Sequence, residues 1–317
     1  MEYVQFGDSD LDVSVVGLGT WAIGGEFFGK VDDKESIRAI HGAIESGINL
    51  IDTAPPYGSG HSEEVVGQAI KDRRHSVVLA TKVGTYKENG NFIRSLEPDS
   101  IRQQLEASLR RLQVDVIDLY QIHWPDPDTP LEESLEELIR LKEEGKFRYL
   151  GVSNFNVQQM EKVREMTELT SLQPHYSLLE RKAESSLLPY CEKRNIGVLS
   201  YGTLAGGILT GKYKEIPDFE EGDERGSFYR YFREPLWNRI QDLLDVMRGI
   251  AAEHNSPVAQ VAINWSIQQE GVTSALVGAK TEAQAQSNAM AGRWELSEEE
   301  LQQLDEKYER IMNSDAR

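Results

Sequence analysis

The sequence of 317 residues contains a single cysteine, Cys191, so it has neither an internal disulfide nor a zinc site built from cysteines. It has no apolar run that approaches the ~20 residues of a membrane span. The first residues, MEYVQFGDSDLD, lack both the basic and the apolar segment of a signal peptide. These absences predict a cytoplasmic protein that does not enter a membrane.

Basic residues are also scarce, with 34 lysines and arginines against 53 aspartates and glutamates and a formal net charge of −19. Nucleic acids are polyanions that such a surface repels, so we expect no DNA or RNA partner. The acidic excess indicates a well-solvated surface, and adaptation to high salt is the alternative explanation. The apolar fraction of 39% is typical of a globular chain and not of a disordered one.

A strand-like apolar run followed by a helix-like segment recurs eight times along the chain. The strand-like runs cover residues 15–19, 49–52, 76–82, 116–121, 147–152, 170–173, 197–201 and 272–277. Eight such units predict a (β/α)8 barrel, also called a TIM barrel, as one domain over residues 1–317. The alternative is an open doubly wound sheet with a second domain. It is disfavoured because no Gly-x-Gly-x-x-Gly follows the first run.

Three segments lie outside this repeat. Residues 3–6 and 12–14 predict an N-terminal β-hairpin over the barrel floor. Residues 297–310 predict an extra C-terminal helix that begins at a capping box formed by Ser297 and Glu300. Residues 213–235 form a long, aromatic and charged stretch that is typical of a binding lid.

Polar residues end three consecutive predicted strands, where active sites of barrels lie. Asp52 ends the second strand, Lys82 the third, and His123 follows the fourth, while Tyr57 comes five residues after Asp52. A lysine ammonium beside a phenol stabilises phenolate and is expected to lower the tyrosine pKa from ~10. An aspartate keeps that lysine charged, and a histidine can bind a carbonyl oxygen. The group predicts hydride delivery to a carbonyl with Tyr57 as proton donor, with a nicotinamide cofactor and no metal.

The sequence resembles the aldo-keto reductase superfamily over nearly its whole length. The matching motifs are NLIDTAPPYG at 49–58, GHSEEVVG at 60–67, ATKVG at 80–84, DLYQIHWPD at 118–126, GVSNF at 151–155 and LAGGILTGKY at 204–213. The HWPD segment and GLGTWAIGG at 17–25 are most similar to the bacterial branch of general-stress and inositol-operon reductases.

The resemblance implies a role for each matching residue. Tyr57 would be the general acid, assisted by Lys82 and Asp52, and His123 would orient the substrate carbonyl. The nicotinamide end would be held by Ser153, Asn154, Gln173, Tyr201, Gly19, Thr20, Trp21 and Asp52. The pyrophosphate would lie along Gly202, Thr203, Leu204, Ala205, Gly206, Gly207, Leu209 and Lys212, with Arg225 closing over the cofactor. The adenosine end would lie at Gly278, Ala279, Lys280, Gln284 and Asn288.

Lys280 decides the expected cofactor, because its charge suits a 2′-phosphate at a helix start. The resemblance therefore implies NADPH, with NADH as the alternative since Gln284 is neutral. Trp21, Phe27 and Trp124 are expected to wall the substrate pocket. We expect a cytoplasmic carbonyl reductase, monomeric or weakly oligomeric, that acts on aldehydes and also on ketones. A nicotinamide-sensing regulatory subunit and a sugar or inositol dehydrogenase working in the oxidative direction are the alternatives.

Overall fold

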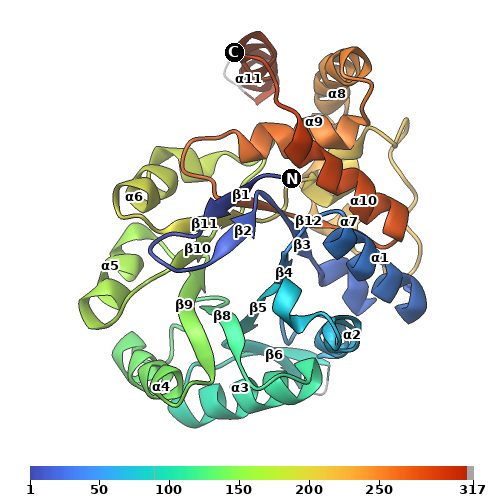
Figure 1. The fold of residues 1–317 in the computed structure, drawn as a ribbon. Coiled ribbons are helices and arrows are strands. Elements are labelled where there is room, and N and C mark those ends of the chain that lie inside the picture. Colours follow the sequence, from blue (N-terminus) through green and yellow to red (C-terminus); the bar gives the residue numbers. More distant parts are fainter. Residues whose placement is uncertain (89, 313–317) are drawn as a thin grey trace.

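In the computed structural model, which describes residues 1–88 and 90–312, eight parallel strands form a closed barrel in the order β10-β11-β12-β3-β4-β5-β8-β9 (Figure 1). This confirms the predicted (β/α)8 fold. The strands are short and buried on both faces, which is why they appear in the sequence as continuous apolar runs. Their bounds are β3 (Val16–Gly19), β4 (Leu50–Asp52), β5 (Val78–Val83), β8 (Ile117–Ile122), β9 (Phe147–Ser153), β10 (Ser171–Gln173), β11 (Gly197–Ser200) and β12 (Ser274–Gly278).

Helices surround the barrel and bury apolar side chains against it. In α3, for example, Ile101, Leu105, Ser108 and Leu112 are buried at the helical spacing seen in the sequence. The surrounding helices are α1 (Asp33–Glu45), α2 (His61–Ile70), α3 (Pro98–Leu112), α4 (Leu131–Glu143), α5 (Val157–Met166), α6 (Leu187–Lys193), α8 (Leu236–Glu253), α9 (Val258–Ile267) and α10 (Glu282–Met290). Short 3-10 helices are η1 (Trp21–Gly24), η2 (Arg74–Ser76), η3 (Lys182–Ser185), η4 (Ala205–Thr210), η5 (Arg230–Phe232) and η6 (Ala291–Arg293).

The predicted N-terminal hairpin is formed by β1 (Tyr3–Gln5) and β2 (Asp12–Ser14), and it lies across one end of the barrel (Figure 1). Phe6, just after β1, is fully buried, and a Cβ at Gly197 would lie 2.6 Å from its ring. Gly197 begins β11, so the hairpin covers the ends at which the strands begin. The opposite end of the barrel, where the strands finish, is left for the loops that carry the polar residues.

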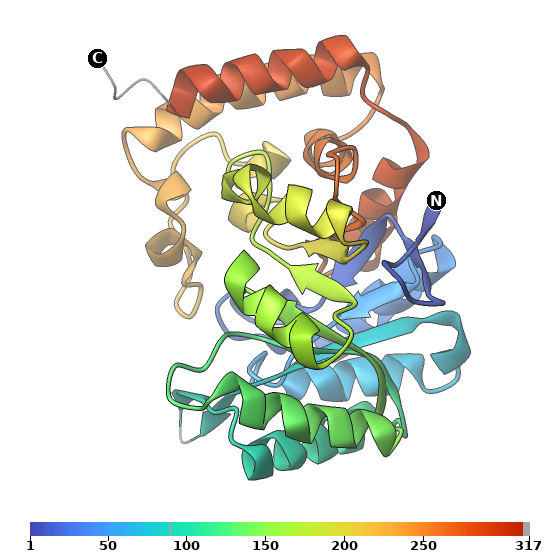
Figure 2. The ribbon, with the colours of Figure 1, turned by 90° about the vertical axis from the view of Figure 1, so that its left-hand side faces the viewer.

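The extra C-terminal helix is α11 (Glu298–Met312), which lies along α8 on the outside of the barrel (Figure 2). Its capping box is present, since the Ser297 backbone donates to Glu300 Oε2 at 2.7 Å and the Glu300 backbone donates to Ser297 Oγ at 3.2 Å. Residues 313–317 of the predicted domain lie outside the described part of the chain, so a single domain over 1–317 stays a prediction. Among the described helices, none has the length and apolar character to cross a membrane.

Two further elements sit in the loops that follow the strands. A second hairpin, β6 (Thr85–Glu88) with β7 (Asn91–Arg94), follows β5 and was not predicted. The stretch 213–235 contains one short helix, α7 (Arg225–Phe228), and the helix η5. In this stretch Glu224 donates its backbone N–H to the Phe27 carbonyl at 2.9 Å, which ties the segment to the loop after η1.

Candidate active site

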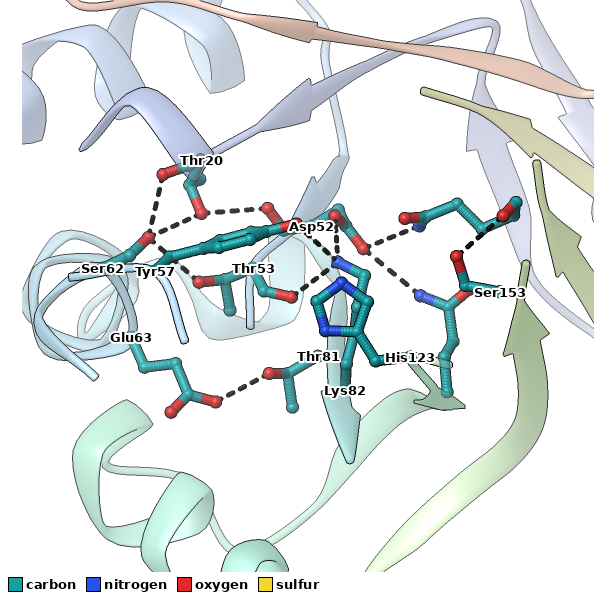
Figure 3. A network of polar contacts seen from close by, with 12 residues as sticks. Thr20, Asp52, Thr53, Tyr57, Ser62, Glu63, Thr81, Lys82, His123 and Ser153 are labelled. Carbon is teal, nitrogen blue, oxygen red and sulfur yellow. Dashed lines mark hydrogen bonds and ion pairs between the residues drawn. The ribbon is translucent and has the colours of Figure 1, made fainter. Parts of the chain in front are cut away.

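Tyr57, Lys82, Asp52 and His123 come together at the end of the barrel where the strands finish (Figure 3). Lys82 Nζ donates to Asp52 Oδ1 at 2.6 Å and lies 3.4 Å from the Tyr57 hydroxyl oxygen. The Tyr57 and His123 rings meet edge to face, with centroids 6.1 Å apart. The grouping expected from the strand ends is therefore present.

Asp52 is held by more than the lysine. Its Oδ2 accepts hydrogen bonds from Gln121 Nε2 at 3.2 Å and from Gln173 Nε2 at 3.0 Å. Lys82 also donates to the Thr53 carbonyl at 2.9 Å. Every oxygen of the carboxylate thus has a donor, as a buried charge requires. Sequence reasoning missed Gln121 as a member of this site. It could have been found as a polar residue near the carboxyl end of an otherwise apolar strand.

The pKa values of the site correct one expectation. Burial and the negative charge of Asp52 raise the pKa of Tyr57 well above its usual value, although Lys82 was expected to lower it. Burial lowers the pKa of Lys82, and Asp52 opposes that shift. Burial is the largest cause of the Tyr57 shift, so the phenol is not made unusually acidic despite the neighbouring ammonium. Tyr57 therefore keeps its proton at neutral pH.

His123 is neutral for a similar reason. Burial, and then the positive charges of Lys82 and Arg94, hold its pKa well below the usual value. Its backbone is fixed, because its N–H donates to the Val83 carbonyl at 2.9 Å and its own carbonyl accepts from Asn154 Nδ2 at 3.0 Å. Its Nδ1 is buried and has no partner among the described residues. A neutral imidazole placed here can donate one hydrogen bond to a carbonyl oxygen.

Hydroxyl groups connect the tetrad backbone to the first helices. Thr20 donates through Oγ1 to the Asp52 carbonyl at 3.0 Å, and Ser62 Oγ lies 2.8 Å from Thr20 Oγ1 and 3.0 Å from Thr53 Oγ1. These contacts join α2 to the residues that follow β3 and β4, next to Tyr57 (Figure 3). They hold the segment that carries both Asp52 and Tyr57 in a single geometry.

A cleft of about 470 Å³ opens beside the tetrad. Its floor is formed where Gly278 of β12 pairs with Gly19 of β3. A Cβ on either glycine would meet no atom closer than 3.7 Å, so it would project into the open cleft. The expected residues that line it are Gly19, Thr20, Trp21, Asp52, Tyr57, Gln173, Tyr201, Gly202, Thr203, Leu204, Gly206, Gly207, Lys212, Arg225, Gly278, Ala279, Lys280, Gln284 and Asn288.

Other expected cofactor residues lie outside that lining. Ala205 and Leu209 are fully buried in the hydrophobic core. Ser153 Oγ donates to the Gln173 carbonyl at 2.8 Å. Asn154 Oδ1 accepts from the Tyr201 hydroxyl at 2.9 Å. Ser153 and Asn154 therefore sit behind Gln173 and Tyr201, which face the cleft.

Tyr201 presents a flat surface to the cleft because its other side is covered. The His175 ring stacks on it with a centroid distance of 5.0 Å and an interplanar angle of 11°. This stacking and the hydrogen bond to Asn154 together fix the orientation of the Tyr201 ring. A fixed aromatic face is suited to stacking against a planar ring.

The far end of the cleft carries the cations Lys212, Arg225 and Lys280. Arg225 is paired with Asp223, with Nη2 and Oδ2 2.5 Å apart, and it also donates to the Gly206 carbonyl at 3.2 Å. Lys280 donates to the Phe28 carbonyl. Burial and the neighbouring charge of Arg225 lower the pKa of Lys280. This concentration of positive charge suits a phosphate, even though the chain as a whole is acidic.

Aromatic rings form one wall next to Tyr57. Trp21 stacks on Phe27 with centroids 4.5 Å apart and lies 5.9 Å from the Tyr57 ring. Phe228, from the segment 213–235, packs on Phe27 at 5.1 Å. The expected pocket residues Trp21 and Phe27 are thus together beside Tyr57. Trp124 is not part of this stack: it directly follows the tetrad residue His123, and its ring lies 5.2 Å from the guanidinium carbon of Arg94.

The comparisons with known proteins agree with this architecture. The model of the aldo/keto reductase family matches residues 15–309. Aldo-keto reductase YhdN of Bacillus subtilis is 41% identical over 96% of this chain and 92% of its own. An NADH-specific methylglyoxal reductase of Escherichia coli is 36% identical over 94% of this chain and 95% of its own.

Solved structures agree as well. The glycerol dehydrogenase AKR11B4 from Gluconobacter oxydans has a TM-score of 0.88 and 40% identity, covering 98% of this chain and 95% of that one. An aldo/keto reductase from Klebsiella pneumoniae in complex with NADP and acetate has a TM-score of 0.76 and 32% identity, covering 96% and 95%. With the family match over nearly the whole length, the chain belongs to the aldo/keto reductase family.

Proposed function

We propose that this aldo/keto reductase uses NADPH to reduce aldehydes, and also ketones, to alcohols. The observation that carries the proposal is the buried Lys82–Asp52 pair beside the Tyr57 hydroxyl, at the edge of a cleft with a glycine floor. The site chemistry needs a proton donor that is protonated at neutral pH, and the raised pKa of Tyr57 meets that need.

The residues of the cleft fit a nicotinamide dinucleotide. The flat face of Tyr201 and the side chain of Gln173 suit the nicotinamide, the open floor at Gly19 suits the ribose, and the cations at the far end suit the phosphates. When bound, NADPH supplies a hydride to the carbonyl carbon. The solved relative in complex with NADP supports this choice, and the NADH-specific relative keeps NADH as the alternative.

The protein's own groups complete the reaction. His123 donates a hydrogen bond to the carbonyl oxygen and fixes its direction. Negative charge then grows on that oxygen, and Tyr57 transfers its proton there, so that the product is an alcohol. The remaining phenolate is stabilised by Lys82 Nζ, 3.4 Å away, while Asp52 keeps the lysine charged and aimed.

Oxidation of a polyol is the second candidate, because the same site catalyses the reverse reaction and a 40% identical relative is a glycerol dehydrogenase. In that direction Tyr57 accepts the hydroxyl proton. Rates measured in both directions at equal cofactor concentrations separate the two functions.

The test begins with fluorescence titrations of NADPH and NADH, followed by assays of the tighter cofactor with short, aromatic and sugar aldehydes. We expect NADPH to bind and to be oxidised when an aldehyde is present. Absence of binding by either cofactor would overturn the proposal. Binding without turnover of any carbonyl or alcohol would favour a regulatory subunit that senses nicotinamide. Cytoplasmic location and a monomeric or weakly oligomeric state stay predictions.

A further inference from the structure

Arg94 is an exposed cation near the candidate active site, and among the residues that the structure describes it has no acidic partner. Its guanidinium carbon lies 5.2 Å from the centroid of the Trp124 ring. Within residues 1–88 and 90–312, no carboxylate lies within 4.0 Å of it. Two nearby cations do have acidic partners: Lys82 pairs with Asp52, and Lys87 pairs with Glu26. An unpaired guanidinium is notable in a chain with a net charge of −19.

The backbone fixes where Arg94 stands. It is the antiparallel partner of Thr85, and Thr85 is only three residues beyond Lys82. The base of this hairpin is anchored to α3, because the Gly84 N–H donates to Gln104 Oε1 at 2.9 Å. Arg94 therefore lies on a hairpin that begins three residues after the active-site lysine and is anchored to α3, and not on a free loop.

The segment after β8, which carries His123 and Trp124, is also held by hydrogen bonds. The His123 N–H donates to the Val83 carbonyl at 2.9 Å, which places Trp124 next to the base of the hairpin. Asp126 Oδ2 accepts the Leu96 N–H at 2.9 Å, which joins the segment after Trp124 to the residues after Arg94. Arg94 and Trp124, whose guanidinium carbon and ring centroid are 5.2 Å apart, are therefore held on the segments that continue from Lys82 and from His123.

The electrostatic environment of His123 also indicates that Arg94 is near it. The charge of Arg94, after burial and the charge of Lys82, is one of the causes that lower the pKa of His123. A cation that acts on the imidazole also acts on a substrate whose carbonyl oxygen is bound there. Guanidinium groups bind carboxylates and phosphates through two parallel hydrogen bonds.

We propose that Arg94 binds an anionic group, a carboxylate or a phosphate, on a substrate whose carbonyl lies at Tyr57 and His123. This inference rests on the proposed function and specifies its substrate class: short aldehydes that bear an anionic group at the end away from the carbonyl. Trp124 packs against the carbon chain between the two ends. Succinic semialdehyde represents the carboxylate class, and glyceraldehyde phosphate represents the phosphate class.

The test compares kcat/KM for each anionic aldehyde with that for its neutral analogue, butanal or glyceraldehyde. The wild-type protein should prefer at least one anionic substrate. In Arg94→Met the ratio of anionic to neutral kcat/KM should fall about tenfold or more, as expected for loss of a charged hydrogen bond. Arg94→Lys should restore part of the ratio. Arg110→Met, on the outer face of α3, is the matched control and should leave the ratio unchanged.

Calorimetry of the alcohol products gives a readout that does not depend on turnover. γ-Hydroxybutyrate or glycerol phosphate should bind more tightly than butanol or glycerol, and Arg94→Met should abolish the difference. A wild-type protein that reduces neutral aldehydes without preferring either anion would overturn this inference and leave the proposed function standing. A preference that survives in Arg94→Met would overturn it too. If no aldehyde is reduced, the proposed function fails, and the calorimetric difference still decides the role of Arg94.

Discussion

Lys82 and Asp52 form an ion pair that is almost closed to solvent, with Nζ and Oδ1 2.6 Å apart and side chains 0% and 4% exposed. Two buried charges are costly to desolvate, and their attraction repays that cost only when the remaining hydrogen bonds are made. Here Gln121, Gln173 and the Thr53 carbonyl make them. The pair therefore makes both stability and activity sensitive to the same two residues.

Replacing Lys82 with Met should lower the free energy of unfolding by about 3 kcal/mol, because Asp52 is left as a buried charge without its partner. Denaturant unfolding monitored by circular dichroism measures the loss. The double variant Lys82→Met/Asp52→Asn should recover part of this stability but none of the activity. Equal stability of the single and double variants would contradict the coupling.

Replacing Tyr57 with Phe should lower kcat for aldehyde reduction by at least ~100-fold, since only the proton donor is removed. The Kd of NADPH should stay within about twofold of the wild-type value, because the phenol ring remains in place. Steady-state kinetics and a fluorescence titration measure the two quantities. Tyr149→Phe is the control, because the Tyr149 hydroxyl donates to Asp10 at the opposite end of the barrel. Near-normal turnover in Tyr57→Phe would refute the assignment.

The pH dependence should lack a histidine step. The pKa of His123 is lowered well below the usual ~6.5, so this residue is already neutral above that pH and does not titrate there. We therefore expect kcat/KM for reduction to show no inflection near pH ~6.5. Rates measured across that range in buffers of constant ionic strength check this. An acidic limb centred there, absent from His123→Asn, would show that His123 acts as a charged group.

Replacing Lys280 with Ala should weaken NADPH about tenfold and affect NADH far less, because only NADPH carries a 2′-phosphate for the ammonium to bind. Parallel titrations of the two cofactors measure the change in their Kd ratio. Lys193→Ala, exposed on α6, is the control for loss of one positive charge. An unchanged ratio would mean that the cation serves another part of the cofactor or none.

Much of the barrel was predictable because its strands are buried on both faces. Runs such as 76–82 and 116–121 carry apolar residues on both sides, and the helix over 98–112 carries them at helical spacing. The hairpin β6–β7 was not predictable in this way. Its two strands pair with each other, and Phe92 is 66% exposed, so the hairpin carries no continuous buried apolar run that the sequence would reveal.

The residues of the candidate site also differ in whether local sequence could predict them. The four tetrad residues follow from their places at strand ends and from family motifs. Gln121 and Gln173, however, meet Asp52 across 69 and 121 residues of sequence, and only the closed barrel brings them there. The raised pKa of Tyr57 was missed because burial, its largest cause, depends on packing that no local motif records. Arg94 was overlooked since a single cation in a polar hairpin has no distinguishing pattern.

The floor of the cleft is also the seam at which the barrel closes. Gly19 belongs to the first barrel strand and Gly278 to the last, and they lie side by side only once the intervening residues have taken their places. A nascent or truncated chain without β12 has half of the groove and no opposing edge. Tight dinucleotide binding therefore requires that the barrel has closed. Saturating ligand should raise the melting temperature, because it binds across the contact between β3 and β12 in the folded state only.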